Sequence, residues 1–455
     1  MISNLRPYSE YKESGLPWVG RMPAHWSQRR MKFLFQERVQ KGFPGEPLLA
    51  ATQTKGVVRK EDYEERTVTA MKDLHLLKLV ETGDFVISLR SFQGGIEVAH
   101  CRGIISPAYT VLNPRSEARQ SYFRQFFKSP DFIHSLTLFV TGIREGQNID
   151  YERLSRAYLP LPPADEQDLM GRFLTYARGQ IERAIRSKKK LIGLLNEQKQ
   201  AIIHRAVTRG LDPTVPLKPS GIPWLGEIPE HWEVRRLKSF VSNVTNQTAA
   251  MNDDEIYVAL ENVESWTGIV KPQTNQGEVL FVGQVKKFQA DDVLFGKLRP
   301  YLAKVITASS PGVCVGEFFV LRAHDALVWP SFLEHLLRTK VIIDVINSST
   351  FGAKMPRADW QFVGNLRIAL PSVSDQKAII ESIYLKTQPL STASTRLQRE
   401  VELLREYRTR LVADVVTGKL DVREAAKSLP YEAQQPPMEL EPEEQIEDEV
   451  PTIDE

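Results

Sequence analysis

The stretch Ser14-Gly15-Leu16-Pro17-Trp18-Val19-Gly20 occurs a second time in the chain, as Ser220-Gly221-Ile222-Pro223-Trp224-Leu225-Gly226. The similarity continues through Pro23-Ala24-His25-Trp26 and Arg29-Arg30-Met31-Lys32, which return as Pro229-Glu230-His231-Trp232 and Arg235-Arg236-Leu237-Lys238. Eleven of these paired residues are identical, and two of the identities are tryptophan pairs. Such agreement at a fixed spacing indicates an internal duplication.

A second repeated stretch follows further along each copy. Leu161-Pro162 with Glu166-Gln167 corresponds to Leu370-Pro371 with Asp375-Gln376, and the match extends to Leu211-Asp212 and Leu420-Asp421. Between the repeated stretches, residues 33–140 and 240–350 do not resemble each other. The chain therefore consists of two units whose ends are shared and whose middles differ.

Each middle alternates short β-type runs with turn residues, which predicts an α+β domain with a mixed or antiparallel sheet. The runs are Asp84 to Ser88, Tyr109 to Leu112, Asp292 to Phe295 and Phe318 to Leu321. Helices are predicted from Tyr122 to Leu138 and from Pro330 to Ile346.

The repeated C-terminal stretches, residues 165–208 and 374–417, predict two long helices that pair as an antiparallel coiled coil with pseudo-two-fold symmetry. Each carries a narrow stripe of apolar or aliphatic side chains that steps by four and three. At 1.5 Å per residue, about 44 residues would span roughly 65 Å. The stripe positions are Ile181, Ile185, Lys188, Ile192, Leu195, Lys199, Ile202 and Ala206, then Leu390, Ser394, Leu397, Val401, Leu404, Arg408, Leu411 and Val415.

Two questions about these helices stay open in the sequence. Each helix could instead be an amphipathic element packed onto its own domain. Pro389 either starts the regular part of the second helix or kinks it.

A chain of 455 residues has room for two to three domains of ordinary size. We expect a first globular domain at 1–164, its long helix at 165–209, a second globular domain at 210–373, its long helix at 374–418, and an acidic, disordered tail at 419–455.

The charge is distributed unevenly along the chain. The last 24 residues, 432–455, carry ten acids and no Lys or Arg, and we expect them to be disordered. The rest holds 59 basic against 47 acidic residues. A body of that sign suits a polyanion, although surplus cations can also simply keep a surface soluble.

The sequence shows neither a long apolar run nor the pattern of a signal peptide, so we expect a cytoplasmic protein without a membrane segment. Cys101 and Cys314 lie in corresponding strand-like segments. We expect both to be reduced, packed thiols.

Taken in order, these features resemble the specificity subunits of Type I restriction-modification systems. The resemblance rests on the proline-and-tryptophan stretch, the Leu-Pro-x-x-x-(Asp/Glu)-Gln element and a long helix ending near Val-Thr-x-Gly. It covers about residues 17–421. One departure is that Thr208-Arg209-Gly210 stands where the second copy has Thr417-Gly418-Lys419, which shifts the glycine at the helix end.

The resemblance implies a non-catalytic subunit that recognises two short DNA half-sites separated by a fixed spacer. It implies double-stranded DNA, two methyltransferase subunits and motor-nuclease restriction subunits as partners. S-adenosylmethionine, ATP and Mg would then be bound by the partners and none by this chain. Because the two middles differ, the half-sites should have different sequences.

Polar, basic and aromatic loops that follow the predicted strands are the candidate DNA-reading elements, because Arg and Lys suit guanine edges and Asn and Gln can bond adenine. Whether a given residue contacts a base, a phosphate or only solvent is left open by the sequence. The candidates are Arg90, Ser91, Gln93, Arg144, Gln147 and Asn148 in the first domain, and Lys297, Arg299, Tyr301, Lys354 and Arg357 in the second. Gln53, Thr54, Lys55 and Asn262 are weaker candidates.

The four repeated tryptophans lie in the shared stretches, which favours packing at the start of each domain or against the opposite helix over base stacking. They are Trp18, Trp26, Trp224 and Trp232.

An enzyme is the first alternative class of protein. The sequence contains no methyltransferase tetrapeptide, P-loop, H-E-x-x-H motif or zinc-spaced Cys/His cluster. Asp291-Asp292 followed by Lys297 is a loose approach to a nuclease site, but the first copy lacks the lysine. The alternative from another class is a coiled-coil adaptor that binds proteins and never reads DNA.

Overall fold

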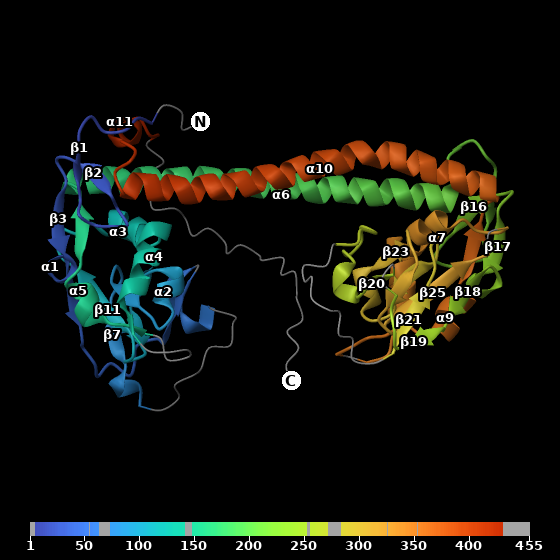
Figure 1. Cartoon of the computed structure of the whole chain (residues 1–455), viewed down its shortest axis with the longest axis horizontal. Helices are drawn as coiled ribbons and strands as arrows, with labels where there is room; N and C mark the ends of the chain where they lie inside the picture. Colours follow the sequence, from blue (N-terminus) through green and yellow to red (C-terminus); the bar gives the residue numbers. More distant parts are fainter. Residues whose placement is uncertain are drawn as a thin grey trace. The chain divides into compact units, whose positions relative to one another are not determined.

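The computed structural model describes residues 5–53, 55–62, 73–141, 148–252, 255–271, 284–324, 326–352 and 354–430. Of the tail expected at 419–455, residues 419–430 are described and include a short helix, α11 (Arg423–Lys427), whereas residues 431–455 lie outside the described residues. The described chain divides into two compact units, unit 1 with residues up to 188 and from 399, and unit 2 with residues 189–398. Each unit contains one globular domain and half of each long helix (Figure 1).

The predicted fold class is confirmed, since the chain combines α+β domains with two long helices that pack together. These helices are α6 (Ala164–Arg209) and α10 (Val373–Val416). In unit 1 their halves run antiparallel, because Glu182 faces Arg408 at 3.5 Å and Lys188 forms an ion pair with Glu400. In unit 2 the other halves contribute to one hydrophobic core.

Each position of the predicted stripe is buried or half-buried. In unit 1, Ile181 and Ile185 of α6 lie in the same core cluster as Val401 and Leu411 of α10. The helix α6 also packs on its own domain near its N-terminal end, as in the alternative interpretation. There Met170 and Phe173 are part of the hydrophobic core of unit 1. The helix α10 continues through Pro389 without a break.

Unit 1 contains the first domain, whose core includes six phenylalanines linked by ring contacts, Phe35, Phe85, Phe123, Phe126, Phe127 and Phe132. Its elements are β1 (Tyr11–Glu13), β2 (Arg21–Pro23), β3 (Ser27–Arg30), α1 (Met31–Leu34), β4 (Phe35–Arg38), β5 (Leu49–Thr52), β6 (Gly56–Arg59), η1 (Lys60–Asp62), η2 (Leu74–Leu76), β7 (Lys78–Val80), β8 (Phe85–Ile87), α2 (Ser91–Gly94), β9 (Glu97–Val98), β10 (Gly103–Ile105), β11 (Thr110–Pro114), α3 (Gln120–Phe126), α4 (Pro130–Leu136), η3 (Thr137–Phe139), β12 (Val140–Thr141), β13 (Asn148–Ile149), α5 (Tyr151–Ser155), β14 (Tyr158–Leu161) and α11 (Arg423–Lys427).

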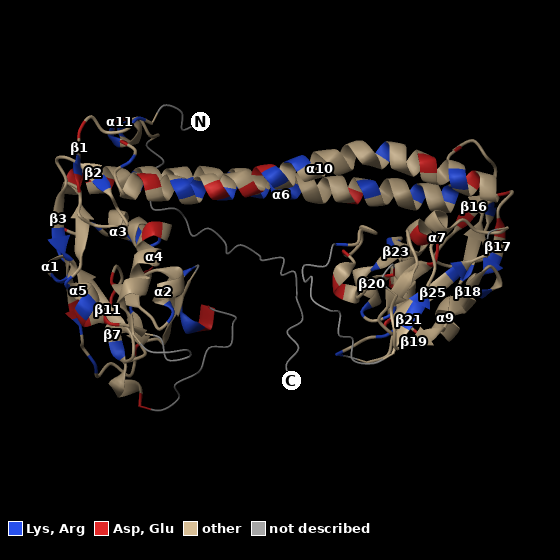
Figure 2. Ribbon diagram, viewed as in Figure 1, with Lys and Arg blue, Asp and Glu red and all other residues tan. Residues whose placement is uncertain are grey.

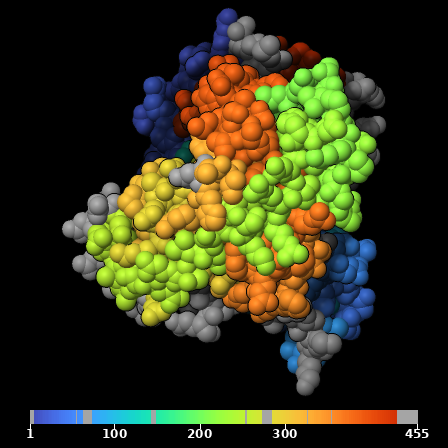
Figure 3. Space-filling view, turned by 90° about the vertical axis from the view of Figure 1, so that its right-hand side faces the viewer, coloured from blue at the N-terminus to red at the C-terminus, as the bar shows by residue number. Residues whose placement is uncertain are grey.

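Unit 2 contains the second domain, and Figure 3 shows one of its faces, where the green residues near the start of the domain adjoin orange residues of the C-terminal part. Its elements are β15 (Leu217–Pro219), β16 (Glu227–Pro229), β17 (Glu233–Arg236), η5 (Leu237–Ser239), β18 (Val241–Val244), β19 (Gln247–Thr248), β20 (Ile256–Val258), η6 (Leu260–Asn262), β21 (Val285–Phe288), β22 (Val293–Gly296), η7 (Pro300–Leu302), β23 (Val305–Thr307), β24 (Gly312–Cys314), β25 (Phe318–Ala323), α7 (Pro330–Leu337), α8 (Lys340–Ser348), α9 (Trp360–Asn365) and β26 (Arg367–Leu370).

The two domains share a four-stranded antiparallel sheet in spite of their different sequences. Its strand order is β4-β11-β8-β9 in the first domain and β18-β25-β22-β23 in the second. The registers agree as well, because Phe85 pairs with Leu112 and Val293 pairs with Leu321. The four predicted β runs are therefore the central strands of these equivalent sheets.

Each predicted helix of the middle segments is wrong in one respect, because a break divides it into two helices. The breaks fall at Ser129, between α3 and α4, and at Thr339, between α7 and α8. Both hydroxyls donate to the carbonyl three residues earlier at 2.7 Å, and both residues have extended ψ angles near 140°. In the first domain Pro130 also disfavours a helical conformation of Ser129.

The repeated opening stretch folds into the same loop in both units. In each, the serine hydroxyl accepts a hydrogen bond at 3.0 Å from the N–H two residues later, Leu16 or Ile222. The strand that follows pairs with the strand before the long helix, β3 with β14 and β17 with β26.

The glutamine of the second repeated stretch explains why that motif occurs twice. The Gln167 side chain accepts a hydrogen bond from the N–H of Arg119 at 2.9 Å, and Gln376 accepts one from Trp329 at 2.7 Å. Each amide also donates to the carbonyl of the motif's proline, Pro162 or Pro371, at 2.9 Å. The glutamine thus ties the start of the long helix to the helix that follows the central sheet.

The tryptophans Trp26 and Trp232 are buried, as expected for packing residues. Each lies against the glycine that follows a long helix. A Cβ on Gly418 would lie 3.0 Å from Trp26, and a Cβ on Gly210 would lie 3.4 Å from Trp232. Both glycines have positive φ. Although the glycine is displaced by one position between the two copies, each long helix is therefore followed by a glycine in the left-handed conformation.

The first and last described segments meet in unit 1. The N–H of Asp421 donates to the carbonyl of Arg6 at 2.8 Å, and Arg423 forms an ion pair with the Asp421 side chain. Nearby, the buried Glu166 carboxylate accepts hydrogen bonds from Trp26 and His25 at 3.0 and 2.8 Å, and from Tyr8.

Cys101 and Cys314 form no disulfide; Cys314 is buried and Cys101 is half-buried. None of the described helices is long and apolar enough to cross a membrane.

Candidate nucleic-acid interface

The first candidate segment of domain 1 is a tight helical turn after β8. Arg90 precedes α2, and Gly95, with φ of +83°, ends it. The side chains of Arg90 and Gln93 are exposed. Ser91 is buried, and its hydroxyl accepts a hydrogen bond from the N–H of Ser88 at 2.8 Å. Its role is to shape the turn, and we leave it out of the proposed contact surface.

The second candidate segment of domain 1 lies beside the first. Asn148 begins β13, is exposed, and pairs with Thr141 in a short hairpin. The strand β13 lies next to α2. Arg144 and Gln147 lie outside the described residues. The fold therefore brings Asn148 close to the turn that carries Arg90 and Gln93, although more than fifty residues separate them in sequence.

The two candidate segments of domain 2 are joined by backbone hydrogen bonds. The N–H of Arg299 donates to the carbonyl of Pro356, and the N–H of Ala358 donates to the carbonyl of Lys297, both at 2.8 Å. Arg299 has φ of +50°, which turns the chain sharply into η7. A loop that follows β22 and a loop that precedes α9 thus form one surface.

The side chains on this surface differ in how freely they can meet a ligand. Tyr301 and Lys354 are exposed, and Lys297 and Arg299 are half-buried. Arg357 forms a bidentate pair with Glu317, with its Nε and Nη2 each 3.2 Å from a carboxylate oxygen. This pairing raises the pKa of Arg357 and makes it a brace for the loop.

Two exposed apolar residues on the same loop were missed as contact residues from the sequence. Phe351 is 78% exposed and Met355 is 47% exposed. Apolar side chains can contact a thymine methyl or wedge between base pairs. Their position beside Gly352 and Lys354, in a segment of turn residues, was the signal that could have indicated exposure.

The weaker candidates divide in a similar way. Gln53 is exposed and lies against the α2 turn, since a Cβ on Gly94 would be 2.8 Å from its side chain. Lys55 is half-buried. The Asn262 side chain accepts a hydrogen bond from the N–H of Ala259 at 2.8 Å, which is a structural role. Thr54 lies outside the described residues.

A buried aspartate stands at the start of the central strand in both domains. Asp84 accepts bidentate hydrogen bonds from Arg38 at 2.7 and 3.2 Å, and Asp292 accepts them from Arg322 at 2.8 and 2.7 Å. Because Asp292 is committed to Arg322, the loose nuclease pattern is a structural ion pair. Among the described residues, no group of three His, Cys, Asp or Glu side chains is placed to hold a metal ion.

Lys and Arg are spread over both domains and both helices and alternate with acids (Figure 2). In this view no single strongly basic face stands out among the described residues. The cations at the reading loops are therefore identified by position in the fold and not by local charge density.

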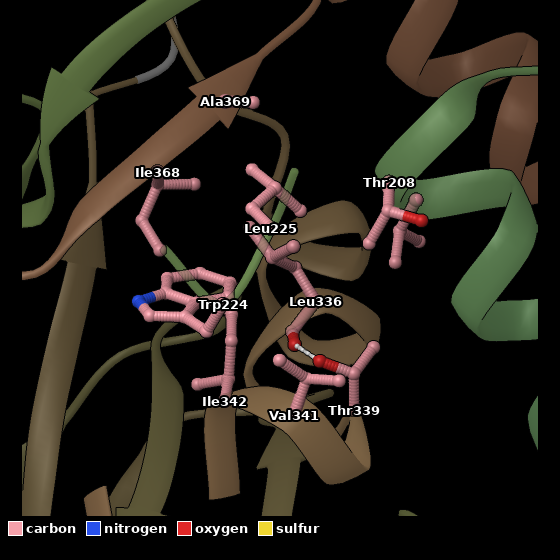
Figure 4. A pocket seen from close by; sticks show the side chains of 10 residues that line it. Thr208, Trp224, Leu225, Leu336, Thr339, Val341, Ile342, Ile368 and Ala369 are labelled. Carbon is pink, nitrogen blue, oxygen red and sulfur yellow. Dashed lines mark hydrogen bonds between the residues drawn. The ribbon is translucent and has the colours of Figure 1, made fainter. Parts of the chain in front are cut away.

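The framework offers one small apolar pocket within unit 2 (Figure 4). The pocket lies between Trp224 and Leu225 of the opening stretch and the helices α7 and α8, and Leu336, Val341 and Ile342 line it. Its volume of about 10 Å³ would hold at most one water molecule. Trp224 thus packs on its own domain, as predicted for the repeated tryptophans.

The two units define a class of protein. One framework, repeated twice, holds two domains with the same central sheet and with unlike reading loops, and it joins them through paired helices.

Comparisons with known proteins lead to a particular family. The chain is similar to the Type I restriction enzyme MjaVIII specificity subunit of Methanocaldococcus jannaschii, with 22% identity over 340 residues, covering 71% of this chain and 75% of the relative. It is also similar to the Type I restriction enzyme EcoDI specificity subunit of Escherichia coli, with 19% identity, covering 64% of this chain and 69% of the relative. No family model matches the chain.

A solved structure shows the same fold. It comes from work on complex assembly and conformational transition of the type I R-M system, with a TM-score of 0.60 and 14% identity, covering 88% of this chain and 99% of that chain. The resemblance found in the repeated motifs is confirmed: the chain is similar in sequence to curated specificity subunits of Type I restriction enzymes, and it shares the fold of a solved structure from a type I R-M system.

Proposed function

We propose that this chain is the DNA-recognition subunit of a Type I restriction-modification enzyme. Each domain reads one half of a bipartite target, and the helices α6 and α10 fix the spacer between the halves. The chain carries no catalytic group of its own and directs the partner subunits to the target.

One observation carries this proposal. In both domains, two loops distant in sequence come together beside the equivalent strand of the same sheet, β8 or β22, while the residues in those loops differ. A shared scaffold with variable loops is the arrangement expected of a recognition module. Arg90, Gln93 and Asn148 present side chains suited to base edges in domain 1, and Lys297, Arg299 and Tyr301 do so in domain 2. The exposed Lys354 is suited to a phosphate contact.

The repeat also supports two equivalent partner sites. Leu194 of α6 and Leu403 of α10 occupy corresponding positions and are 50% and 46% exposed. Leu191 and Tyr407, one turn away on the respective helices, are exposed as well. Exposed apolar side chains on a helix suit a packed protein interface. We assign these two surfaces to two methyltransferase subunits, with motor-nuclease subunits joining the complete enzyme.

The cofactors then belong to the partners. S-adenosylmethionine would be bound by the methyltransferase subunits, and ATP and Mg by the motor-nuclease subunits. The site of action would be the cytoplasm, where the partners meet the cell's DNA.

The test is a methylation map made with the assembled complex. The chain is co-expressed with its methyltransferase, and methylated adenines are located by sequencing plasmid DNA that carries many sequence contexts. We expect one bipartite motif with two unlike halves and a constant spacer. The variant Arg299→Ala should weaken selection of one half-site while the complex still assembles.

A coiled-coil adaptor predicts a different result. In that case the complex would bind DNA without sequence preference at low salt, or not bind it, and no bipartite motif would appear. If Arg299→Ala abolished assembly, Arg299 would be a structural residue and not a reading residue.

A further inference from the structure

Lys128 lies beneath the reading surface of domain 1 and joins three chain segments. Its ammonium donates to the carbonyl of Gln53 at 3.0 Å and to the carbonyl of Gly94 at 2.8 Å, and it forms an ion pair with Glu97. An ammonium has three N–H donors, and these three contacts use all of them. Lys128 is therefore committed to the protein and is not itself a DNA contact.

The carbonyls that Lys128 holds belong to exposed reading elements. Gly94 is the last residue of the α2 turn, which carries Gln93, and Gln53 follows β5 in the neighbouring hairpin. The α2 turn also packs closely on the segment that carries Lys128, because a Cβ on Gly95 would lie only 2.2 Å from the carbonyl oxygen of Phe127. Lys128 thus holds the backbones of both loops through hydrogen bonds, in addition to the direct contact of the Gln53 side chain with Gly94.

The ion pair is costly to keep in place. Glu97 is 2% exposed, and its Oε2 is buried without a hydrogen-bond partner. Burial raises the pKa of Glu97 to about 7, and burial also lowers the pKa of Lys128. Apolar residues of similar size at such a site are often as stabilising as the buried pair. Stability alone therefore does not explain why a lysine and a glutamate stand here.

We propose that Lys128 is the positioning residue for half-site recognition by domain 1, holding the Gln53 and α2 loops at the separation that the DNA bases require. This inference rests on the proposed function. Domain 2 uses a different device, the Arg357–Glu317 pair and the backbone bonds between its loops, so the dependence on Lys128 is confined to one half of the target.

The experiment uses the full chain in complex with its methyltransferase. The double variant Lys128→Met with Glu97→Gln removes the clamp without leaving an unpaired buried charge. Methylation of a library randomised over the mapped motif gives the base preference at each position. We expect preference at the domain 1 half-site to fall at least tenfold, with preference at the other half-site unchanged and assembly retained.

Two further variants separate positioning from general stability. Leu112→Ala truncates a buried side chain in the core of the same domain without touching the clamp. It should lower the melting temperature and leave base preference at both half-sites intact. The single variant Glu97→Gln keeps Lys128 and both of its carbonyl contacts, so it should also keep the preference.

The outcomes are distinct. If the double variant keeps wild-type preference, or loses preference equally at both half-sites, the inference is wrong. Loss of preference in Glu97→Gln alone would also overturn it, because the charge pair and not the carbonyl contacts would then hold the loops. If the wild-type complex shows no bipartite preference, the proposed function itself fails, and the inference fails with it.

Discussion

Gly418 packs directly against Trp26, where a side chain would not fit. A Cβ at this position would lie 2.3 Å from Cδ of Pro23 and 3.0 Å from the indole, and the residue has φ of +79°. The contact connects the end of α10 to the repeated opening stretch of unit 1, and the corresponding glycine of unit 2 allows a matched comparison.

Gly418→Ala should destabilise unit 1 by more than Gly210→Ala destabilises unit 2. Both replacements place alanine at positive φ, which costs about 1 kcal/mol. Only the first adds a steric clash, since the Cβ on Gly210 would lie at an ordinary 3.4 Å from Trp232. Thermal unfolding of the two variants should show the larger shift for Gly418→Ala, and equal shifts would contradict the contact.

Gln376→Ala should cost about 2 to 3 kcal/mol, because it leaves the N–H of Trp329 and two carbonyls without their partner in a buried place. Gln376 is fully buried. The neighbouring Asp375→Ala serves as a control, since Asp375 is only half-buried and its carboxylate lies 3.7 Å from His231. Chemical denaturation of both variants checks the difference, and a Gln376→Ala variant as stable as wild type would remove the proposed role of the motif.

Lys354→Ala should weaken DNA binding by about the same factor for every sequence. Lys354 is exposed on the domain 2 loop. The loss of one phosphate contact reduces the slope of log affinity against log salt concentration by about 1 in magnitude. The control Lys427→Ala changes the net charge equally at an exposed lysine of unit 1. Salt titrations of binding by the complex measure both, and an unchanged slope for Lys354→Ala would show that this lysine does not contact a phosphate.

The stability of unit 1 should fall as the pH rises through the range set by Glu97. The carboxyl has an ordinary pKa near 4.5 in the unfolded chain and a pKa of about 7 in the folded domain, where burial outweighs the neighbouring Lys128. The folded state therefore binds the proton more tightly. The stabilisation of unit 1 by the protonated Glu97 is fully present below pH 4.5 and is lost as the pH rises through 7.

This contribution amounts to about 3 kcal/mol at most, from about 1.4 kcal/mol per pKa unit. Unfolding measured at pH 5 and pH 8 gives the change, and Glu97→Gln should reduce it. An identical pH dependence in the two proteins would show that Glu97 ionises normally.

The framework could be predicted from the sequence because its signals are local or repeated. The stripe from Ile181 to Ala206 follows helical spacing, and the repeated glycines and prolines fix the same loop twice. The central strands were also evident as short apolar runs. The helix breaks at Ser129 and Thr339 were missed, because a hydroxyl that bonds to a carbonyl three residues earlier leaves little trace in apolar periodicity.

The reading surface could be predicted only in part. The loops were found from their turn residues, but the contacts between them depend on tertiary structure. Nothing local indicates that Arg357 pairs with Glu317, that Ser91 points inward, or that Lys128 reaches the carbonyl of Gln53. These contacts join residues 3 to 75 positions apart, and a polar residue in a loop looks the same in sequence whether it meets a ligand or a neighbouring strand.

The hydrogen bond between Arg6 and Asp421 brings a segment near the start of the described chain next to a segment near its end. In unit 2 the end of α6 runs on to β15 through residues 210–216, whereas unit 1 crosses the corresponding gap between α10 and β1 without a peptide bond. The fold should therefore tolerate circular permutation, with a linker from the end of α11 to Leu5 and new termini in the exposed segment after Leu211. Folding would then not depend on which of the two domains comes first along the chain.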